Sequence, residues 1–573
     1  MLQTLTTPRG ETLSGMPWQV YPRPQMRRDS YINLNGEWDF AVSSGKPETF
    51  DMRITVPFCP ESRLSGIGRH FEEGAPLWYR RRFLLPEGFR RERVLLHIGA
   101  ADQIAEVFVN GQHLCRHEGG YASFCVDITE ALAEENELVI RCTDDLHDQA
   151  FPYGKQVTNR GGMWYTPVSG IWQTVWLESV PGTYIENLNI ENHGASVTIS
   201  TVPPLEGTVS VEPLGQFPLE NGQVTIAPEN PHFWCPDDPY LYRFTVETAQ
   251  DKVESYFAIR SLEIKKVGEY PRLCLNGKPY FFHGLLDQGY WPEGLLTAPA
   301  PESYADDILA MKNLGFSTLR KHIKVEPEEF YYQCDRLGMI VWQDMVNNGS
   351  YRYFRDTVLP TVGIQKRNDR RLHRDERSRN AFRQGAVDAV NQLKNHPCIC
   401  YWTIFNEGWG QFDSDRVCRW FRTLDATRFI DTTSGWFRGK NTDVDSRHQY
   451  FGKLRLKGDG LRPLVLSEFG GKTWRVEGHI FNPDKTYGYG ACPTKEALNE
   501  AVAALYRESI LPAVEKGLCA AIYTQVSDVE DEVNGLMTYD RRVVKPDGDT
   551  MLSIAQALRD AMEKTVASFE KMG

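Results

Sequence analysis

Eight short, largely apolar segments recur between residues 281 and 526 and alternate with segments of helical period. Apolar runs without a 3.6-residue period suit strands that are buried on both faces, as in a parallel sheet. The segments are Phe281–Leu286, Ser317–His322, Ile340–Met345, Cys398–Glu407, Phe429–Ser434, Ser446–Tyr450, Pro463–Phe469 and Cys519–Val526. Eight strand–helix repeats within residues 266–573 predict a (β/α)8 barrel rather than an open sheet.

The chain before residue 266 has a different pattern, in which short alternating strands are separated by turn signals such as Asn110-Gly111. Residues 1–182 are predicted to form a β-sandwich of the jelly-roll type, a sugar-binding-type domain. Residues 183–265 have the length and strand spacing of an immunoglobulin-like sandwich. Three domains also suit the length, because 573 residues are too many for one core.

Charge and composition exclude several classes of protein. The formal charge of −12 is unfavourable for nucleic-acid binding, which needs a basic surface. No apolar stretch reaches the length of a membrane span, and the first residues lack the pattern of a secretion signal, so we expect a cytoplasmic protein. The 12 cysteines are scattered without a CxxC pair, which favours reduced core cysteines over a metal or redox site.

Two of the predicted barrel strands end on a glutamate. The strand from Cys398 ends at Asn406-Glu407, and the strand from Pro463 carries Glu468 near its end. Barrel enzymes place their chemistry at the carboxyl ends of the strands. Two carboxylates presented in this way suit glycoside hydrolysis, which uses such a pair.

Several motifs in their order along the chain resemble glycoside hydrolase family 2, the family of β-galactosidases, β-glucuronidases and β-mannosidases. The resemblance covers nearly the whole chain, and each motif alone would be weak. The motifs are Arg28–Trp38, Val56–Phe58, Val109–Gly111, Gly170–Trp172, Leu275–Pro279, Asn406–Glu407 and Ser467–Gly470. The family plan of a jelly roll, an immunoglobulin-like domain and a catalytic barrel agrees with the division predicted from periodicity.

The resemblance implies a role for four residues. Glu407, after the fourth strand, matches the family acid/base, and Glu468, after the seventh, matches the nucleophile. Asn406 matches the asparagine that hydrogen-bonds the sugar 2-hydroxyl, and Tyr450 matches the tyrosine that contacts the nucleophile. The expected enzyme is therefore a retaining exo-β-glycosidase that removes terminal β-linked sugars by double displacement.

Further polar and aromatic residues at strand ends are predicted to line the same pocket, because barrel geometry brings them to the catalytic face. Those taken as substrate-binding candidates are His322, Asp287, Asp344, His448, Trp436, Trp474, Tyr523 and Gln525, and His283 and Arg320 occupy similar positions.

The terminal sugar is not determined by these motifs. Family glucuronidases grip the sugar carboxylate with an Asn-x-Lys after the eighth strand, but Ser527–Asn534 contains no lysine. The loop after the third strand, residues 346–380, is instead strongly basic, with Arg352, Arg355, Lys366, Arg367, Arg370, Arg371 and Arg374. Arg352 or Arg355 could bind a uronic acid, galacturonic or glucuronic. Alternatively, the loop is a solvated surface whose charges pair with Asp369, Asp375 and Glu376 or with the acids after the eighth strand. Its length also suits a functional lid or a segment that reaches a neighbouring subunit.

Three functional hypotheses remain open at this point. The first is the exo-β-glycosidase, acting on a galactoside-type sugar or the corresponding uronide. The second is a non-catalytic carbohydrate-binding protein on the same fold, and the third is an endo-acting or transglycosylating enzyme with the same two glutamates. None requires a cofactor, no metal-ligand spacing is recognisable, and the expected partner is a small-molecule or oligosaccharide β-glycoside. A homo-oligomer is compatible with the resemblance.

Overall fold

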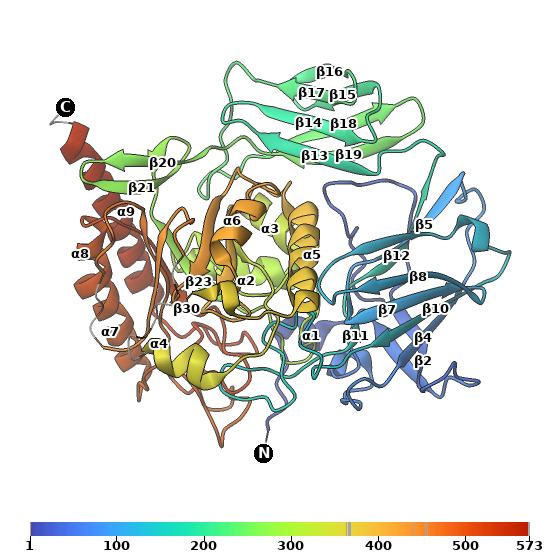
Figure 1. Cartoon of the computed structure of the whole chain (residues 1–573), viewed down its shortest axis with the longest axis horizontal. Coiled ribbons are helices and arrows are strands. Elements are labelled where there is room, and N and C mark those ends of the chain that lie inside the picture. The colour runs from blue at the N-terminus through green and yellow to red at the C-terminus, as the bar shows by residue number, and fades with distance from the viewer. Residues whose placement is uncertain are drawn as a thin grey trace.

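The structure is a computed structural model that describes residues 2–361, 364, 368–437, 439–452, 454 and 456–570. Figure 1 shows two β-sandwiches, the first in blue and the second in green, lying against a barrel that runs from yellow to red. The first sandwich follows helix α1 (Pro8–Thr12) and pairs two antiparallel sheets.

The first sandwich packs a four-stranded sheet against a six-stranded sheet. The smaller sheet has the order β1 (Tyr31–Asn33), β12 (Val175–Val180), β5 (Arg93–Ile98) and β9 (Phe124–Asp127). The larger has the order β3 (Met52–Val56), β2 (Gly36–Val42), β4 (Leu77–Phe83), β10 (Asn136–Thr143), β7 (Ile104–Val109) and β8 (Gln112–Glu118). The short strands β6 (Ala101–Asp102) and β11 (Gly170–Ile171) pair separately. Along β7 buried and partly exposed residues alternate, as a strand with one face on the core requires.

The second sandwich is smaller. One sheet has the order β13 (Asn187–Asn192), β14 (Val197–Val202) and β17 (Gln223–Ile226). The other has the order β16 (Gly215–Leu219), β15 (Gly207–Val211), β18 (Tyr242–Thr248) and β19 (Lys252–Phe257). Their inner faces share one apolar core that includes Val209 and Val246. The three-stranded sheet β20 (Leu262–Val267), β21 (Tyr270–Leu275) and β22 (Lys278–Pro279) leads from here into the barrel.

The barrel consists of eight strands, β23 (Phe282–Asp287), β24 (Thr318–Lys321), β25 (Ile340–Asp344), β26 (Ile399–Asn406), β27 (Phe429–Ser434), β28 (Asp445–Gln449), β29 (Leu464–Gly470) and β30 (Leu518–Thr524). The strand pairs β23–β24, β24–β25, β25–β26, β26–β27, β28–β29, β29–β30 and β23–β30 are all parallel, as the sequence predicts. Pairing of β23 with β30 joins the first strand to the last. All eight predicted segments contain a strand, and β26 is buried along its whole length, because helices and barrel core cover its two faces.

Helices connect and cover the strands. They are α2 (Glu302–Asn313), α3 (Glu328–Leu337), α4 (Leu359–Thr361), α5 (Glu376–Leu393), α6 (Ser414–Phe421), α7 (Lys495–Leu505), α8 (Leu511–Val514) and α9 (Gly548–Glu570), with π-helical turns at Phe354–Val358 and Tyr506–Ile510. Short 3₁₀ turns occur at Arg63–Ser65, Thr129–Ala131 and Asp369–Arg371. Helix α3 ends at Gly338, where φ is 72° and an added Cβ would lie 2.4 Å from the Pro236 carbonyl oxygen. Within the described ranges, no helix combines the length and apolar character that a bilayer span needs.

From this architecture we propose that the chain consists of three domains, with boundaries at 182/183 and 265/266.

A buried arginine connects the first two domains. The Arg28 guanidinium lies 3.1 Å from Glu178 on β12 and forms two hydrogen bonds with Asp251, in the turn before β19. All three side chains are almost inaccessible to water. Arg28 compensates the charge of Asp251, and it shares the compensation of Glu178 with His97, whose Nε2 lies 3.3 Å from that carboxylate.

Replacing Arg28 with methionine is therefore expected to destabilise the contact between the sandwiches by about 3–5 kcal/mol, because the buried Asp251 loses its cation and the buried Glu178 keeps only His97. Urea unfolding followed by circular dichroism measures the change. Arg53→Met is the control, since Arg53 is 64% exposed where it pairs with Glu37 and Asp39 and should contribute only about 0–1 kcal/mol. Equal unfolding midpoints for the two variants would contradict the prediction.

Candidate active site

The two glutamates predicted from the strand ends face each other at the carboxyl end of the barrel. Glu407 directly follows β26, and Glu468 lies in β29; both are buried. A carboxylate oxygen of each lies within 4.8 Å of the other and of a ring nitrogen of His448. Glu407 has a φ of 50°, an unusual value for a non-glycine residue, and its N–H donates to Ser434 O at 3.0 Å. Such strained backbone is frequent at functional sites.

His448, at the end of β28, lies between the two carboxylates. Its Nδ1 is 2.8 Å from Glu407 Oε1 and 3.6 Å from Glu468 Oε2, and its Nε2 is 3.0 Å from Ser434 Oγ. Tyr450, two residues after His448, contacts the nucleophile candidate, because its hydroxyl donates to Glu468 Oε2. The His448 imidazole and the Tyr450 phenol, at the end of β28, thus contact the two glutamates directly.

Arg320, on β24, is the centre of the hydrogen-bond network under the glutamates. Its guanidinium donates to both oxygens of Asp344 at 3.0 Å, to Glu468 Oε1 at 2.9 Å and to Asn406 Oδ1 at 2.8 Å. His322 Nδ1 lies 2.8 Å from Asp344 Oδ2. This fully buried arginine therefore fixes the positions of three acceptors from three different strands.

The environments of the two glutamates push their pKa values apart. Burial raises the pKa of Glu407, and the nearby negative charge of Glu468 raises it further, against the opposing effect of His448. For Glu468, burial also opposes ionisation, but the charges of His448 and Arg320 outweigh it and hold the pKa at about 2. Below the raised pKa of Glu407, the pair therefore holds one proton, on Glu407.

Of the other predicted pocket residues, His322, Asp344, Asn406 and His448 belong to this network. Asn406 Oδ1 accepts from Arg320, whereas its buried Nδ2 has no hydrogen-bond partner within the described part of the chain. An amide donor left free beside two carboxylates is available to a ligand. Trp436 lies at the edge of the network, with its ring centroid 6.4 Å from that of His448.

Several predicted residues are engaged elsewhere. Asp287 forms an ion pair with Lys321 at 2.7 Å, Gln525 hydrogen-bonds Gln288 and Asn534, and the Tyr523 hydroxyl accepts from the Lys472 N–H. Trp474 packs half-buried against the barrel core, and His283 contacts Gly315 O and Tyr506 Oη. These side chains support the loops and walls of the barrel, because buried strand-end polar groups also satisfy neighbouring backbone and side chains.

The basic loop at 346–380 does not present Arg355 as a free cation. The Arg355 guanidinium donates to both carboxylate oxygens of Asp356 and to Ser350 O. Arg352 is exposed, and its N–H donates to Asp356. Lys366 and Arg367 lie outside the described residues. Among the described residues, the acids after β30 pair elsewhere: Asp528 pairs with Lys545, and Asp531 with Arg160.

Sequence reasoning missed residues that reach the site from the first sandwich. Trp164 stacks at an angle on Trp409, with centroids 5.2 Å apart, and Tyr351 contacts both rings. Lys155 Nζ lies 5.0 Å from the centre of the Trp409 ring. Since the contacts of Trp164 and Lys155 with the barrel join positions more than 180 residues apart in the chain, no local pattern could have indicated them.

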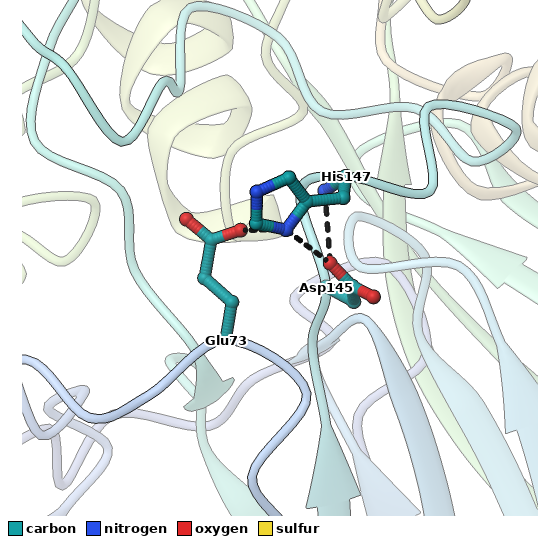
Figure 2. Close-up of side chains that lie close together, drawn as sticks. All are labelled: Glu73, Asp145 and His147. Carbon is teal, nitrogen blue, oxygen red and sulfur yellow. Dashed lines mark hydrogen bonds and ion pairs between the residues drawn. The ribbon is translucent and has the colours of Figure 1, made fainter.

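Two groups of potential metal ligands occur among the described residues. One is the catalytic candidate set Glu407, His448 and Glu468. The other, on the first sandwich, is Glu73, Asp145 and His147, shown in Figure 2, where His147 Nδ1 lies 2.8 Å from Glu73 and 3.0 Å from Asp145. Both carboxylates are directed at the same imidazole nitrogen, an arrangement that also occurs in surface ion pairs.

A parallel eight-stranded barrel with two facing glutamates at the carboxyl ends of its strands is characteristic of barrel glycoside hydrolases. Comparison with known families specifies which one. Residues 266–482 match "Glycosyl hydrolases family 2, TIM barrel domain", residues 69–161 match "Glycosyl hydrolase 2 galactose-binding domain-like", and residues 183–260 match "Glycosyl hydrolases family 2". The chain belongs to glycoside hydrolase family 2, a family of retaining β-glycosidases.

Individual relatives are distant. A β-galactosidase of Thermoanaerobacter pseudethanolicus is 24% identical over 57% of this chain and 44% of its own length. A β-glucuronidase of Bacteroides fragilis is 22% identical over 66% of this chain and 56% of its own length. The chain therefore spans about half the length of these curated relatives. The solved structure of a β-glucuronidase from an uncultured Clostridium species superposes with a TM-score of 0.71 at 19% identity, covering 95% of this chain and all of that one, and so shares the fold.

Proposed function

We propose that this protein is a retaining exo-β-glycosidase in which Glu468 is the nucleophile and Glu407 the acid/base. The observation that carries the proposal is the pair of buried carboxylates with oxygens within 4.8 Å of each other. Retaining enzymes hold their carboxyl groups about 5–5.5 Å apart, whereas inverting enzymes need about 6.5–9.5 Å to admit a water molecule between acid and base. The short separation favours double displacement.

In the first step, the ionised Glu468 attacks the anomeric carbon while Glu407 donates its proton to the leaving oxygen. The bond between the anomeric carbon and that oxygen breaks, and a glycosyl ester of Glu468 forms. The pKa of about 2 for Glu468 keeps the nucleophile charged, and the raised pKa of Glu407 keeps the acid protonated.

In the second step, Glu407, now ionised, removes a proton from water, and the resulting hydroxide attacks the anomeric carbon. The ester bond to Glu468 breaks, and the sugar leaves with its original β configuration. Tyr450 and Arg320 hold the Glu468 carboxylate from both oxygens, so the nucleophile keeps one orientation through both steps. The free Nδ2 of Asn406 is the donor that we assign to the sugar 2-hydroxyl.

The substrate that we propose is a terminal β-linked sugar of the galactoside type or the corresponding uronide. Both sugar classes are represented in the names of the similar proteins, a β-galactosidase and a β-glucuronidase. Trp164, Tyr351 and Trp409 contact one another, and Trp409 lies two residues beyond Glu407. We propose that this aromatic cluster limits the pocket to one terminal sugar.

A matched panel of p-nitrophenyl β-glycosides tests this function, with galactose, glucose, mannose, fucose, glucuronic acid and galacturonic acid as the sugars. We expect turnover of at least one β-glycoside, none of its α-anomer, and a first-formed β product by NMR. An α product would overturn the retaining mechanism. Binding of sugars without turnover of any glycoside would favour the alternative, a non-catalytic carbohydrate-binding protein.

A further inference from the structure

A segment of the first sandwich is docked onto the barrel loop that follows β25. The Tyr153 N–H donates to Asn347 O at 3.0 Å, and the Tyr153 hydroxyl donates to Gly349 O at 2.8 Å. On the other side of Lys155, Gln156 Nε2 donates to Asp102 at 2.9 Å and to Tyr121 at 3.0 Å. The backbone of Lys155 is therefore fixed from both neighbours, so its side chain starts from a defined position.

The Lys155 side chain leads from this segment to the candidate active site. It is only 6% exposed, and its Nζ lies 5.0 Å from the ring centroid of Trp409, 5.8 Å from Trp164 and 5.9 Å from Tyr165. Trp409 follows Glu407 by two residues, and its N–H donates to Asn406 O at 2.9 Å. Its ring centroid lies 6.3 Å from that of His322. The ammonium thus adjoins the loop after β26, which presents Glu407 next to Asn406.

Lys155 differs from Arg320, Lys321 and Lys324 in that its contacts among the described residues are with aromatic rings and not with an acid. Within the part of the chain that the structure describes, its Nζ forms no hydrogen bond or ion pair. By contrast, Arg320 pairs with Asp344 and Glu468, and Lys321 and Lys324 both pair with Glu326. Three aromatic ring faces lie next to the Lys155 ammonium, and a mostly buried ammonium without a counter-ion favours the binding of an anion.

The acids nearest to Lys155 have other partners. Glu532 accepts from the Tyr165 hydroxyl at 2.5 Å and from Asn534 Nδ2 at 3.0 Å. Burial lowers the pKa of Lys155, and the charges of Glu532, Glu468 and Glu407 oppose that effect. These three carboxylates attract the ammonium toward the pocket, but none of them lies within ion-pair distance of it in the described structure.

We propose that Lys155 is a specificity residue that binds the carboxylate of an acidic terminal sugar in this pocket. The proposal rests on the proposed function and deepens it, because it selects the uronide over the neutral sugar. A uronic acid supplies one carboxylate, and an ammonium donates charge-assisted hydrogen bonds to it. The cation would then come from the first sandwich, instead of the 346–380 loop or the stretch after β30.

The first test compares Lys155→Met, Lys155→Gln and Lys155→Arg with the wild-type protein on two substrate pairs: β-glucuronide with β-glucoside, and β-galacturonide with β-galactoside, all as p-nitrophenyl glycosides. We expect the wild type to prefer a uronide. Lys155→Met and Lys155→Gln should lower kcat/KM for that uronide by about 10- to 150-fold, the range for a lost hydrogen bond to a charged group. Lys155→Arg should retain more of the preference, since it keeps the charge.

The neutral sugar of each pair provides the internal comparison, and its kcat/KM should change much less. Lys46→Met, at an exposed position of the same sandwich, is the matched control and should leave both substrate classes unaffected. Equal losses on acidic and neutral sugars would overturn the proposal and leave Lys155 with a structural or electrostatic role. A wild-type preference for neutral sugars would overturn it as well, while leaving the proposed glycosidase intact.

Two further measurements do not depend on an active variant. Wild-type hydrolysis of a p-nitrophenyl uronide is compared with that of its uronamide, which has nearly the same shape but no charge; equal kcat/KM values would contradict a role for the ammonium. In the Glu468→Gln background, calorimetry with free galacturonate, glucuronate and the parent hexoses measures binding without turnover. Lys155→Met should weaken only uronate binding there. Because this binding measurement does not depend on catalysis, it tests the role of Lys155 separately from the proposed glycosidase function.

Discussion

Glu468→Gln is expected to abolish turnover, lowering kcat by about 10⁴- to 10⁶-fold on every glycoside, or roughly 5.5–8 kcal/mol of transition-state stabilisation. The amide is nearly isosteric but neutral, so it cannot form the glycosyl ester. It also cannot balance the charge that develops on the sugar ring. The loss should be in kcat more than in KM, because the nucleophile acts mainly in the transition state.

The control for this variant is Glu477→Gln, at an exposed position a few residues beyond β29, which should retain full activity. Thermal unfolding of both variants shows whether the fold is kept. In Glu468→Ala, added azide should restore slow turnover and give the α-glycosyl azide, since the anion attacks from the face that the carboxylate vacates. Undiminished activity of Glu468→Gln would remove the nucleophile assignment.

Glu407→Gln is expected to have an effect that depends on the leaving group. General acid catalysis contributes about 10²- to 10⁴-fold, and that contribution is largest for alkyl glycosides, whose leaving oxygen needs a proton. An activated dinitrophenyl glycoside needs little protonation. For that substrate the first step should therefore be nearly normal, and the glycosyl enzyme should accumulate for want of a base in the second step.

The pH dependence offers an independent readout of the same residue. The pKa of Glu407 is raised above its ordinary value, and the acid is active only while protonated. The wild-type kcat/KM should therefore fall tenfold per pH unit as the pH rises through that raised pKa, and Glu407→Gln should lose this alkaline limb. Because the pKa of Glu468 is about 2, its titration should not limit activity above about pH 3. A pH profile of kcat/KM that is identical in wild type and Glu407→Gln would contradict the assignment.

The barrel and the two glutamates could be predicted from the sequence because their signals are local. Each strand is a short apolar run, and a strand that is buried on both faces needs such a run wherever its neighbours lie. Glu407 and Glu468 follow directly, since the ends of parallel strands lie on one face of a barrel. The same reasoning predicted that His322, Asp344, Asn406 and His448 lie near this pair, and they belong to its hydrogen-bond network.

That reasoning was less successful in predicting which side chains are free to bind a ligand, because this depends on the direction in which each side chain points. Asp287, Tyr523 and Gln525 are near strand ends as expected, yet Lys321, the Lys472 N–H and Asn534 occupy their polar atoms. Arg355 is basic and well placed in sequence, but its nearest acid is the next residue, Asp356. Position along a strand specifies which end a residue occupies; it does not specify which of several neighbours its polar atoms meet.

By itself, the sequence determined the order of the domains, the barrel and the pair of candidate catalytic carboxylates, because periodicity and strand-end position are properties of short segments. Only the tertiary structure decided the electrostatic environment of that pair. Arg320 is placed under three acceptors from different strands, and Lys155 is carried to the site by another domain. Charges interact through space at a strength set by distance and burial, and neither quantity can be read along the chain.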